Sequence, residues 1–336
     1  MEYSIIQKIV RGSGICAGER VLIHFWGEDA EKAVANGFMA ATASLGATPV
    51  LLQQSRSVNR QIFSTADAAC FDAAYFRSLG QFDTVLDLFA YQPITLGEPL
   101  EEPQQELYRR YIRQLFGALM QSKRFLQIRI PTAANAAESG LDPDDYIRRM
   151  QDAYDVDYTG LRQQCSACAA SLSCHDRLVL QTGKDHRLTF TLTERKWHID
   201  AGDGDLPCGE IYIAPIEEKT SGSVRFESLH WEDLGKFENV TLQIDQGRVT
   251  AASIPEIQRF LEQQPPENTV ICELGLGMNP HVSSLCGYTV LDEKMAGTFH
   301  IALGANRMFG GENEAAIHLD LVGTGAFSLT GEEAST

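Results

Sequence analysis

Five side chains that can bind divalent metals lie in the last third of the sequence, within short blocks of apolar residues and glycine. They are Glu210 in GEIYIAP, Glu273 in ICELGLG, His300 in TFHIALG, and His318 with Asp320 in IHLDLV. Carboxylates and imidazoles bind Zn, Mn, Co or Fe. His318 and Asp320 are two residues apart, so on a β-strand both face the same side. We expect this set to hold one or two divalent cations at a catalytic site.

Each ligand block carries a charged or ionisable residue into an apolar run. A single glutamate or histidine is more often solvated or packed than ligating, but the same interruption occurs in four separate blocks. A buried carboxylate without a partner is costly, and a bound cation compensates it. The set contains no thiolate, which favours an open catalytic site over a closed structural zinc. Cys272 precedes Glu273, so we expect its thiol to be buried on the opposite face of the strand.

A second group of possible ligands lies in CSACAASLSCH, which contains Cys165, Cys168, Cys174 and His175. No second CxxC pair follows at zinc-ribbon spacing, and the neighbouring sequence is rich in Ala, Ser and Leu. We therefore favour a packed helix there over metal or redox chemistry. The eight cysteines of the chain are expected to be free thiols in a reducing compartment.

The elements that position the ligand blocks differ between the two halves of the chain. In the first half apolar runs alternate with amphipathic segments, which predicts an α/β domain with a mostly parallel sheet. Beyond Cys174 the sequence changes to alternating strands such as RLTFTLTER. We expect an α/β domain over residues 1–160 and a β-rich α+β domain that carries the metal site over residues 161–336. The predicted elements of the first domain include strands at 21–25, 84–89 and 124–130 and helices at 66–79 and 107–120.

Composition excludes several classes of partner. The chain has 28 Lys and Arg against 45 Asp and Glu, a formal net charge of −17. This charge repels nucleic acid and anionic membrane surfaces. No apolar run approaches the roughly 18 residues that a membrane-spanning helix needs, and the first residues do not resemble a secretory signal. We expect a cytoplasmic protein with neither nucleic-acid nor membrane partners.

The ligand blocks together resemble the aminopeptidase T/aminopeptidase S family of dinuclear metallo-aminopeptidases. The similar blocks extend from about Glu19 to Val322 and include IPTAANAAESGL, GEIY, APIEEKTSGSV, ELGLGMNP, DEKMAGTFHIALG, FGG and HLDLV. In that family two Glu, two His, one Asp and one Tyr bind a pair of metals. The resemblance implies that Glu210, Glu273, His300, His318 and Asp320 are ligands here. Arg307 occupies the position of the Tyr, so we expect either weaker binding of one metal or a guanidinium in its place.

The resemblance also implies an activity. It predicts a homodimer that releases N-terminal amino acids from peptides or similar small substrates through a water activated by two Zn, Co or Mn ions. Glu293, Glu217 and Glu218 are candidates for moving the proton, and Lys294 is a candidate for stabilising the oxyanion.

Two other functions stay open. His300, His318 and Asp320 alone compose the two-His, one-carboxylate set that suits Fe(II) oxygenases, and a ring-cleaving dihydroxypyridine dioxygenase resembles the same peptidase fold. The other possibility is a non-catalytic binding protein in which Arg307 grips a substrate carboxylate. Two Zn or Mn ions per chain would exclude the oxygenase, whereas a single oxidisable Fe would exclude the dinuclear peptidase.

Overall fold

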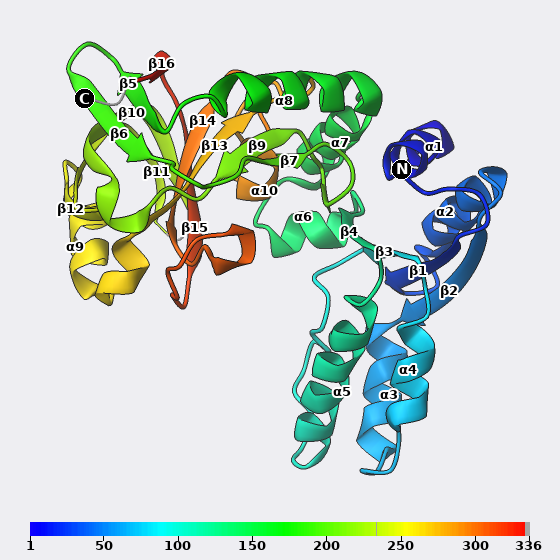
Figure 1. The fold of residues 1–336 in the computed structure, drawn as a ribbon. Coiled ribbons are helices and arrows are strands. Elements are labelled where there is room, and N and C mark those ends of the chain that lie inside the picture. Colours follow the sequence, from blue (N-terminus) through cyan, green and yellow to red (C-terminus); the bar gives the residue numbers. More distant parts are fainter. Residues whose placement is uncertain (233, 333–336) are drawn as a thin grey trace. The chain divides into compact units, whose positions relative to one another are not determined.

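The computed structural model describes residues 1–232 and 234–332 of the chain. It contains two compact units (Figure 1). The first comprises Met1–Tyr158 and Gly202–Cys208, and the second comprises Thr159–Ala201 and the chain from Gly209 onward. The division into domains at residue 160 stays a prediction. Among the described residues, no helix is long and apolar enough to cross a membrane.

The first unit is built on a five-stranded sheet with the strand order β2-β1-β3-β4-β8. Neighbouring strands are parallel throughout, which confirms the predicted α/β class. Its strands are β1 (Arg20–Trp26), β2 (Thr48–Gln54), β3 (Thr84–Phe89), β4 (Arg124–Arg129) and β8 (Asp205–Leu206). Its helices are α1 (Tyr3–Gly12), α2 (Lys32–Ser44), α3 (Arg56–Thr65), α4 (Ala73–Leu79), α5 (Gln104–Leu119), α6 (Ala133–Glu138) and α7 (Pro143–Tyr154).

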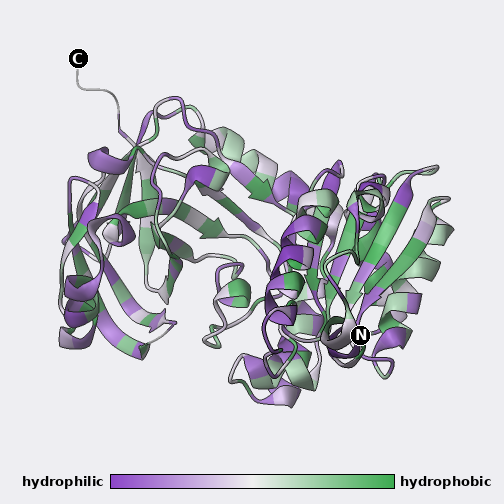
Figure 2. Ribbon diagram, turned by 90° about the horizontal axis from the view of Figure 1, so that it is seen from below, coloured by the Kyte–Doolittle hydropathy of each residue, from purple (hydrophilic) through white to green (hydrophobic). Residues whose placement is uncertain are grey.

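The central strands of this sheet are buried apolar runs. Every residue of β3 is buried, as are six of the seven in β1. Figure 2 shows the hydrophobic colour along the strands and mixed colours on the helices. The helix predicted at 66–79 is wrong in its first half, because Asp72 accepts a hydrogen bond from the amide of Tyr75 and so starts α4 at Ala73. A separate helix, α3, precedes it and was not predicted.

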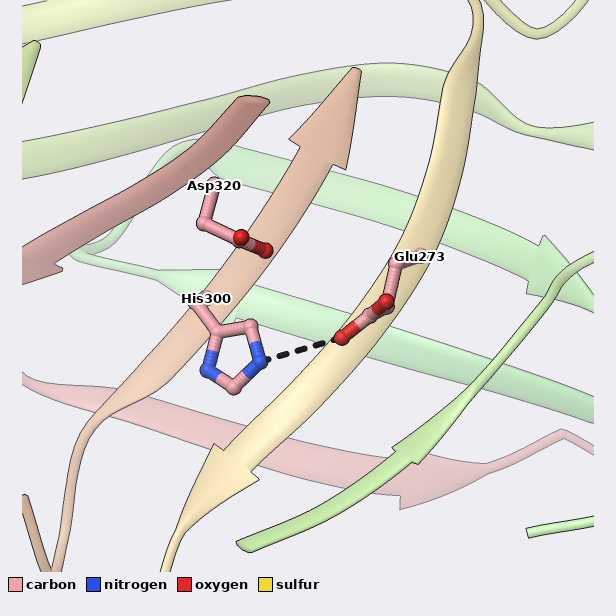
Figure 3. Close-up of side chains that lie close together, drawn as sticks. All are labelled: Glu273, His300 and Asp320. Atoms are coloured by element: carbon pink, nitrogen blue, oxygen red, sulfur yellow. Dashed lines mark hydrogen bonds and ion pairs between the residues drawn. The ribbon is translucent and has the colours of Figure 1, made fainter. Parts of the chain in front are cut away.

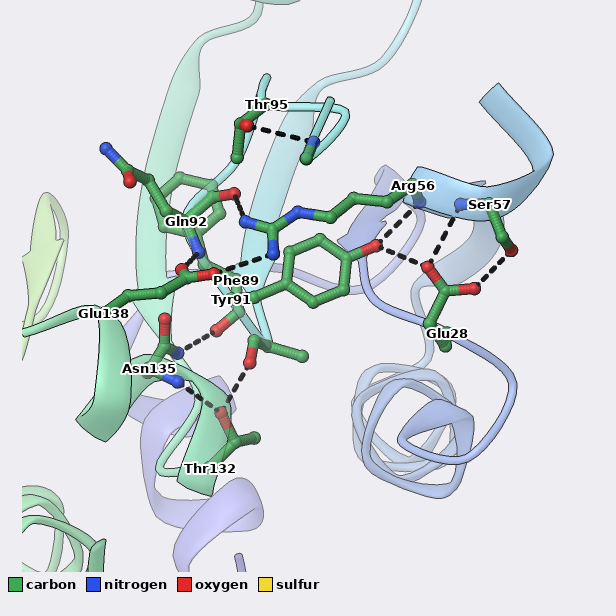
Figure 4. Close-up of polar contacts among 12 residues, drawn as sticks. Glu28, Arg56, Ser57, Phe89, Tyr91, Gln92, Thr95, Thr132, Asn135 and Glu138 are labelled. Carbon is green, nitrogen blue, oxygen red and sulfur yellow. Dashed lines mark hydrogen bonds and ion pairs between the residues drawn. The ribbon is translucent and has the colours of Figure 1, made fainter. Parts of the chain in front are cut away.

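A polar network joins the carboxyl ends of the parallel strands (Figure 4). Glu28, which follows β1, accepts hydrogen bonds from the hydroxyls of Ser55 and Ser57, both at 2.6 Å, and of Tyr91 at 3.2 Å. Burial opposes the ionisation of Glu28, but these hydrogen bonds outweigh it and hold the pKa of the carboxyl below its usual value. The Arg56 guanidinium lies 3.9 Å from the centre of the Tyr91 ring. The network therefore fixes the loops after β1, β2 and β3 to one another.

The second unit contains a largely antiparallel sheet of eleven strands. Nine follow the order β16-β5-β6-β10-β15-β14-β13-β9-β7, and β11 and β12 extend from β10. This β-rich arrangement confirms the predicted class. The strands are β5 (Arg177–Thr182), β6 (His186–Thr191), β7 (His198–Asp200), β9 (Glu210–Ile213), β10 (Ser221–Trp231), β11 (Gly235–Asp245), β12 (Arg248–Ala252), β13 (Ile271–Gly277), β14 (Phe299–Gly304), β15 (His318–Thr324) and β16 (Phe327–Gly331).

Helices and 3-10 turns precede or connect the strands of this unit. They are α8 (Tyr158–Leu172), α9 (Pro255–Gln263), α10 (Thr289–Asp292) and the 3-10 turns η1 (Glu217–Lys219), η2 (Pro266–Thr269) and η3 (Arg307–Phe309). The cysteine-rich segment is helical as predicted, with Cys165 and Cys168 in α8, and all three of its cysteines are free thiols.

Candidate metal centre

Four adjacent strands bring the five predicted ligands to one face of the sheet. Glu210 begins β9, Glu273 lies in β13, His300 in β14, and His318 and Asp320 in β15. Residues opposite each other in neighbouring antiparallel strands share a face of the sheet. Because the order β9-β13-β14-β15 is continuous, the strand placements predicted for the ligand blocks are confirmed. The role of the five residues as ligands stays a prediction.

Small residues leave room for the ligands on this face. Ala302 lies between Glu273 and Asp320 in the cross-strand register. Gly275 lies opposite His300, and a Cβ atom at this glycine would lie only 1.9 Å from His300 Nε2. The imidazole therefore occupies the space above Gly275, where any side chain would exclude it.

Glu273 lies between the two imidazoles. Its Oε1 is 3.3 Å from His300 Nε2, and its Oε2 is 3.5 Å from His318 Nε2. His318 Nε2 is also 3.5 Å from Asp320 Oδ1. Figure 3 shows Glu273, His300 and Asp320 converging from three neighbouring strands, and one ligand atom from each lies within 4.8 Å of the others. The carboxylate of Glu273 thus faces a different imidazole with each oxygen.

The orientation of His318 is fixed by its second ring nitrogen. Nδ1 donates a hydrogen bond to the backbone oxygen of Ala305 at 2.8 Å, which leaves Nε2 directed at the carboxylates. Cys272 Sγ lies 3.7 Å from the same Nδ1. The prediction that Cys272 faces away from the site is therefore wrong. The strand register shifts between Ile271 and Glu273, and this irregularity interrupts the simple alternation of faces.

We call the five predicted ligands and the charged residues that contact them the ligand cluster. Lys294 lies at the edge of this cluster, beside Glu210. Its Nζ lies 2.5 Å from Glu210 Oε1, 2.7 Å from Glu293 Oε1 and 3.7 Å from Asp200 Oδ2, and its side chain is only 2% exposed. Burial disfavours the ammonium, but Glu210, Glu293 and Asp200 outweigh it and raise the pKa of Lys294 well above its usual value. An ammonium has three N–H donors, and three carboxylates surround this one. Lys294 is therefore placed to orient Glu210 and Glu293 rather than to meet an oxyanion.

The remaining oxygen of Glu210 faces the cluster. Glu210 Oε2 is buried, lies 3.6 Å from His300 Nε2, and makes no hydrogen bond to any described residue. A buried carboxylate oxygen without a hydrogen-bond partner is costly unless a cation compensates it. This atom supplies a direct reason to expect a bound metal between Glu210 and His300.

The imidazoles titrate far from their usual range because carboxylates surround them. Burial opposes the protonation of His300, but Glu273 and Glu210 outweigh it and raise its pKa to about 9. Burial also opposes the protonation of His318, but its contacts with Asp320 and Cys272 outweigh this effect and raise its pKa to about 12. In the metal-free protein, protons on these rings therefore offset part of the negative charge. Bound cations would take over that role.

The charges of the cluster fit divalent metal ions. Five carboxylates and one ammonium carry a net charge of minus four when all are ionised and the imidazoles are neutral. Two divalent cations balance this charge. The charged residues are Asp200, Glu210, Glu273, Glu293, Asp320 and Lys294.

Three other predicted site residues lie away from the ligand cluster or are engaged elsewhere. Arg307 pairs with Glu314, and its side chain is 63% exposed, so its guanidinium lies on the surface. The replacement of a metal by this guanidinium stays a prediction. Glu217 is buried in an ion pair with Arg195 at 2.8 Å. Glu218 is exposed on η1. Of the three candidates for moving the proton, Glu293 is the one that contacts Lys294 beside Glu210.

Two residues of this face were not predicted from the sequence. Asp200 lies opposite Glu210, and Tyr212 lies opposite both His198 and Gly275. Burial and the charges of Glu210 and Glu273 raise the pKa of Tyr212 above its usual value. The sequence could have indicated Tyr212, because in GEIY it lies two residues after Glu210 and residues two apart on a strand face the same side.

Two solved structures are similar to nearly the whole chain. Wild-type AmpT from Thermus thermophilus is 17% identical, with 97% of this chain and 94% of that chain covered and a TM-score of 0.66. The 2,5-dihydroxypyridine dioxygenase from Pseudomonas putida KT2440 is 15% identical, with 98% and 92% covered and a TM-score of 0.65. At these identities the likeness establishes the fold. A search of the curated proteins gave no match.

Residues 120–335 match the model of a protein family described as thermophilic metalloprotease (M29). This stretch is more than half of the chain and contains all five predicted ligands, Lys294 and Tyr212. The chain therefore belongs to the thermophilic metalloprotease family M29.

Proposed function

We propose that this protein is an aminopeptidase that binds two divalent metal ions and releases N-terminal amino acids from peptides. Membership of a metalloprotease family supports a metal-dependent peptidase. The observation that carries the finer proposal is the position of Glu273, whose two oxygens face His300 and His318 separately. Glu210 and His300 would hold metal on one side of Glu273, and His318 and Asp320 would hold metal on the other.

When bound, the two ions would lower the pKa of a water molecule and polarise the scissile carbonyl. The residues of the chain supply the remaining functions. Glu273 would contribute one oxygen on the side of His300 and the other on the side of His318. The hydrogen bond to Ala305 keeps His318 Nε2 free to ligate. Lys294 holds one oxygen of Glu210, and the other oxygen faces His300.

Glu293 is our candidate for moving the proton from the attacking water to the departing amine. Its Oε1 lies 2.7 Å from Lys294 Nζ, and a carboxylate beside the reacting groups can take up and release a proton. Glutamates in this role typically contribute about 10²–10⁴-fold to the rate. Replacing Glu293 by Gln removes the base and conserves the shape, so we expect kcat to fall within that range at unchanged metal content.

The test combines metal counting with peptide hydrolysis. The purified protein is loaded in turn with Zn, Co and Mn, the metal per chain is measured by plasma mass spectrometry, and release of free amino acid is followed from dipeptides and aminoacyl anilides. We expect two ions per chain and hydrolysis of substrates with a free α-amine. N-acetylated forms of the same peptides are the matched control and should resist cleavage. Absence of hydrolysis with all three metals would refute the proposal.

The composition of the predicted ligand set also suits a second function, that of an Fe(II) dioxygenase. His300, His318 and Asp320 by themselves compose a two-His, one-carboxylate set. The chain would then be a mononuclear Fe(II) dioxygenase acting on a small ring substrate. The additional carboxylates of Glu210 and Glu273 favour the peptidase, because a single iron needs fewer carboxylate ligands than a pair of metal ions. One Fe per chain, with oxygen consumption in the presence of a dihydroxypyridine, would support the dioxygenase instead.

We also propose that the active species is a homodimer, as the family resemblance implies. Light scattering coupled to gel filtration measures this directly, with an expected mass of twice 37.1 kDa. A non-catalytic binding role for Arg307 has less support, because its guanidinium pairs with Glu314 on the surface.

A further inference from the structure

The hydrolysis proposed above places negative charge on the oxygen of the scissile carbonyl, and a hydrogen-bond donor beside the metal ions would help to stabilise that charge. Neither of the two positively charged side chains predicted as site residues is placed to donate this hydrogen bond. Lys294 is surrounded by Asp200, Glu210 and Glu293, and Arg307 is paired with Glu314 on the surface. A donor on the ligand face of the sheet must therefore be sought among neutral side chains.

Tyr212 lies on the same strand as the predicted ligand Glu210. It lies two residues after Glu210 in β9, so both side chains project from the same face. Tyr212 is opposite Gly275, which in turn is opposite His300. Because the His300 ring occupies the space above Gly275, it lies about one strand spacing, roughly 5 Å, from the backbone of Tyr212.

Neighbouring rings hold the Tyr212 ring in place. It stacks on His198 with ring centres 5.2 Å apart and meets Phe309 edge to face at 5.4 Å. Phe309 also contacts the His318 ring, at 5.8 Å, so the aromatic group adjoins the ligands directly. A donor whose ring is fixed in this way needs little reorganisation when charge develops.

The hydroxyl of Tyr212 is available for a ligand. Within residues 1–232 and 234–332 it makes no hydrogen bond, whereas the hydroxyls of Tyr91, Tyr108, Tyr111 and Tyr154 are all engaged. A phenol keeps its proton at neutral pH and can therefore donate. The side chain is half-buried.

We propose that Tyr212 is a catalytic residue whose hydroxyl donates a hydrogen bond to the carbonyl oxygen of the peptide being cleaved. This inference rests on the proposed peptidase function. As the water oxygen bonds to the carbonyl carbon, the π electron pair moves to the carbonyl oxygen, and the negative charge there strengthens the hydrogen bond from Tyr212. The carbonyl then re-forms, the C–N bond breaks, and the amine leaves with the proton taken from water. Tyr212 keeps its own proton throughout.

The first test replaces Tyr212 by Phe, which removes the hydroxyl and keeps the ring that packs on His198 and Phe309. Loss of one oxyanion donor typically lowers kcat by about 10²–10³-fold. We expect a fall of about 100-fold in kcat with little change in KM and with the wild-type metal content. Tyr3→Phe, at an exposed position in the first unit, is the matched control and should behave like the wild type. A Tyr212→Phe protein that retains the wild-type kcat would overturn the assignment.

A second readout separates this inference from the proposed function. A phosphinic pseudodipeptide mimics the tetrahedral arrangement at the carbonyl carbon, and its affinity is measured by calorimetry on the metal-loaded protein. We expect Tyr212→Phe to weaken phosphinate binding at least tenfold while the affinity for the free product amino acid stays unchanged. If the wild type cleaves peptides but Tyr212→Phe binds the phosphinate as tightly as the wild type does, only the role proposed for Tyr212 is refuted. If the wild type neither cleaves peptides nor binds the phosphinate, both proposals fall.

Discussion

Gly275 shows how a single residue without a side chain can make a site possible. Glycine weakens a strand, because its backbone loses more freedom on folding than that of other residues. Here the missing Cβ leaves the space in which the His300 ring lies. The ELGLG block of the sequence therefore combines Glu273, a predicted ligand, with Gly275, whose missing side chain accommodates His300.

Replacing Gly275 by Ala should displace His300 and impair metal binding. The added Cβ would lie 1.9 Å from Nε2, so the ring must move. We expect a destabilisation of about 1–3 kcal/mol, typical of overpacking, and a loss of bound metal measured by plasma mass spectrometry. Gly117→Ala is the control, since a Cβ at this position in α5 meets nothing within 4 Å. That control should stabilise the protein by about 0.5–1 kcal/mol.

Removing the Lys294 ammonium should leave buried carboxylates without a partner. We expect Lys294→Met to lower the free energy of unfolding of the chelator-treated protein by about 3–5 kcal/mol, measured by urea denaturation. Lys294→Arg keeps the charge and should lose less. Lys236 forms a comparable 3.1 Å pair with Glu238, but 67% of its side chain is exposed. Lys236→Met should therefore change stability little, and an equal loss in both variants would contradict the role given to Lys294.

At the scale of elements, the sequence predicts the ligand strands well because each is an apolar run interrupted by one or two ionisable residues. The parallel sheet is also predictable, since β1 and β3 are short, buried and almost wholly apolar. The surroundings of Lys294 cannot be predicted from the sequence, because only the tertiary fold brings Asp200 and Glu210 close to it. The side on which Cys272 lies depends on a register shift that no pattern of residue types records.

Helix α3 illustrates another limit. Its segment RSVNRQIFST has only two buried residues, Asn59 and Phe63, and one of them is polar. Its start is fixed by Ser55, whose side chain caps the amide of Val58. Ser55 also donates to Glu28 from the loop after β1, a contact that cannot be inferred from local sequence.

The network around Glu28 predicts a pH dependence for the first unit. The pKa of Glu28 is lower in the folded protein than in the unfolded chain, so its stabilisation is present above the unfolded pKa and is lost as the pH falls through the folded pKa. We expect Glu28→Gln to lower the free energy of unfolding by about 1–3 kcal/mol at pH 7, as typical for hydrogen bonds to a charged group. The difference from the wild type should shrink at pH 3. A difference that stays constant between these pH values would refute the assignment.

At the scale of the whole molecule, the formal charge of −17 favours cations near the protein. The same excess of carboxylates opposes folding through mutual repulsion unless counter-charges are bound. In the ligand cluster, this repulsion is concentrated among buried groups. Stability of the whole chain should consequently depend on the metal content.

Chelation should lower the melting temperature. A metal that binds only the folded state stabilises it by about 2.7 kcal/mol at a free concentration of 100 times Kd. We expect EDTA treatment to reduce Tm in a calorimetric scan and Zn, Co or Mn to restore it. Mg is the control, because it prefers oxygen ligands and retains water, and it should restore little. Equal Tm values with and without EDTA would contradict a metal bound at this site.

Strands β13, β14 and β15 are consecutive in the chain as well as adjacent in the sheet. Four of the five predicted ligands therefore belong to one meander of about 50 residues, and only Glu210 comes from further away. Contacts between near neighbours in sequence form faster than distant ones, because less loop entropy must be lost. The meander can thus assemble a partial binding site before β9 docks, which would make metal ions capable of accelerating folding as well as stabilising its product.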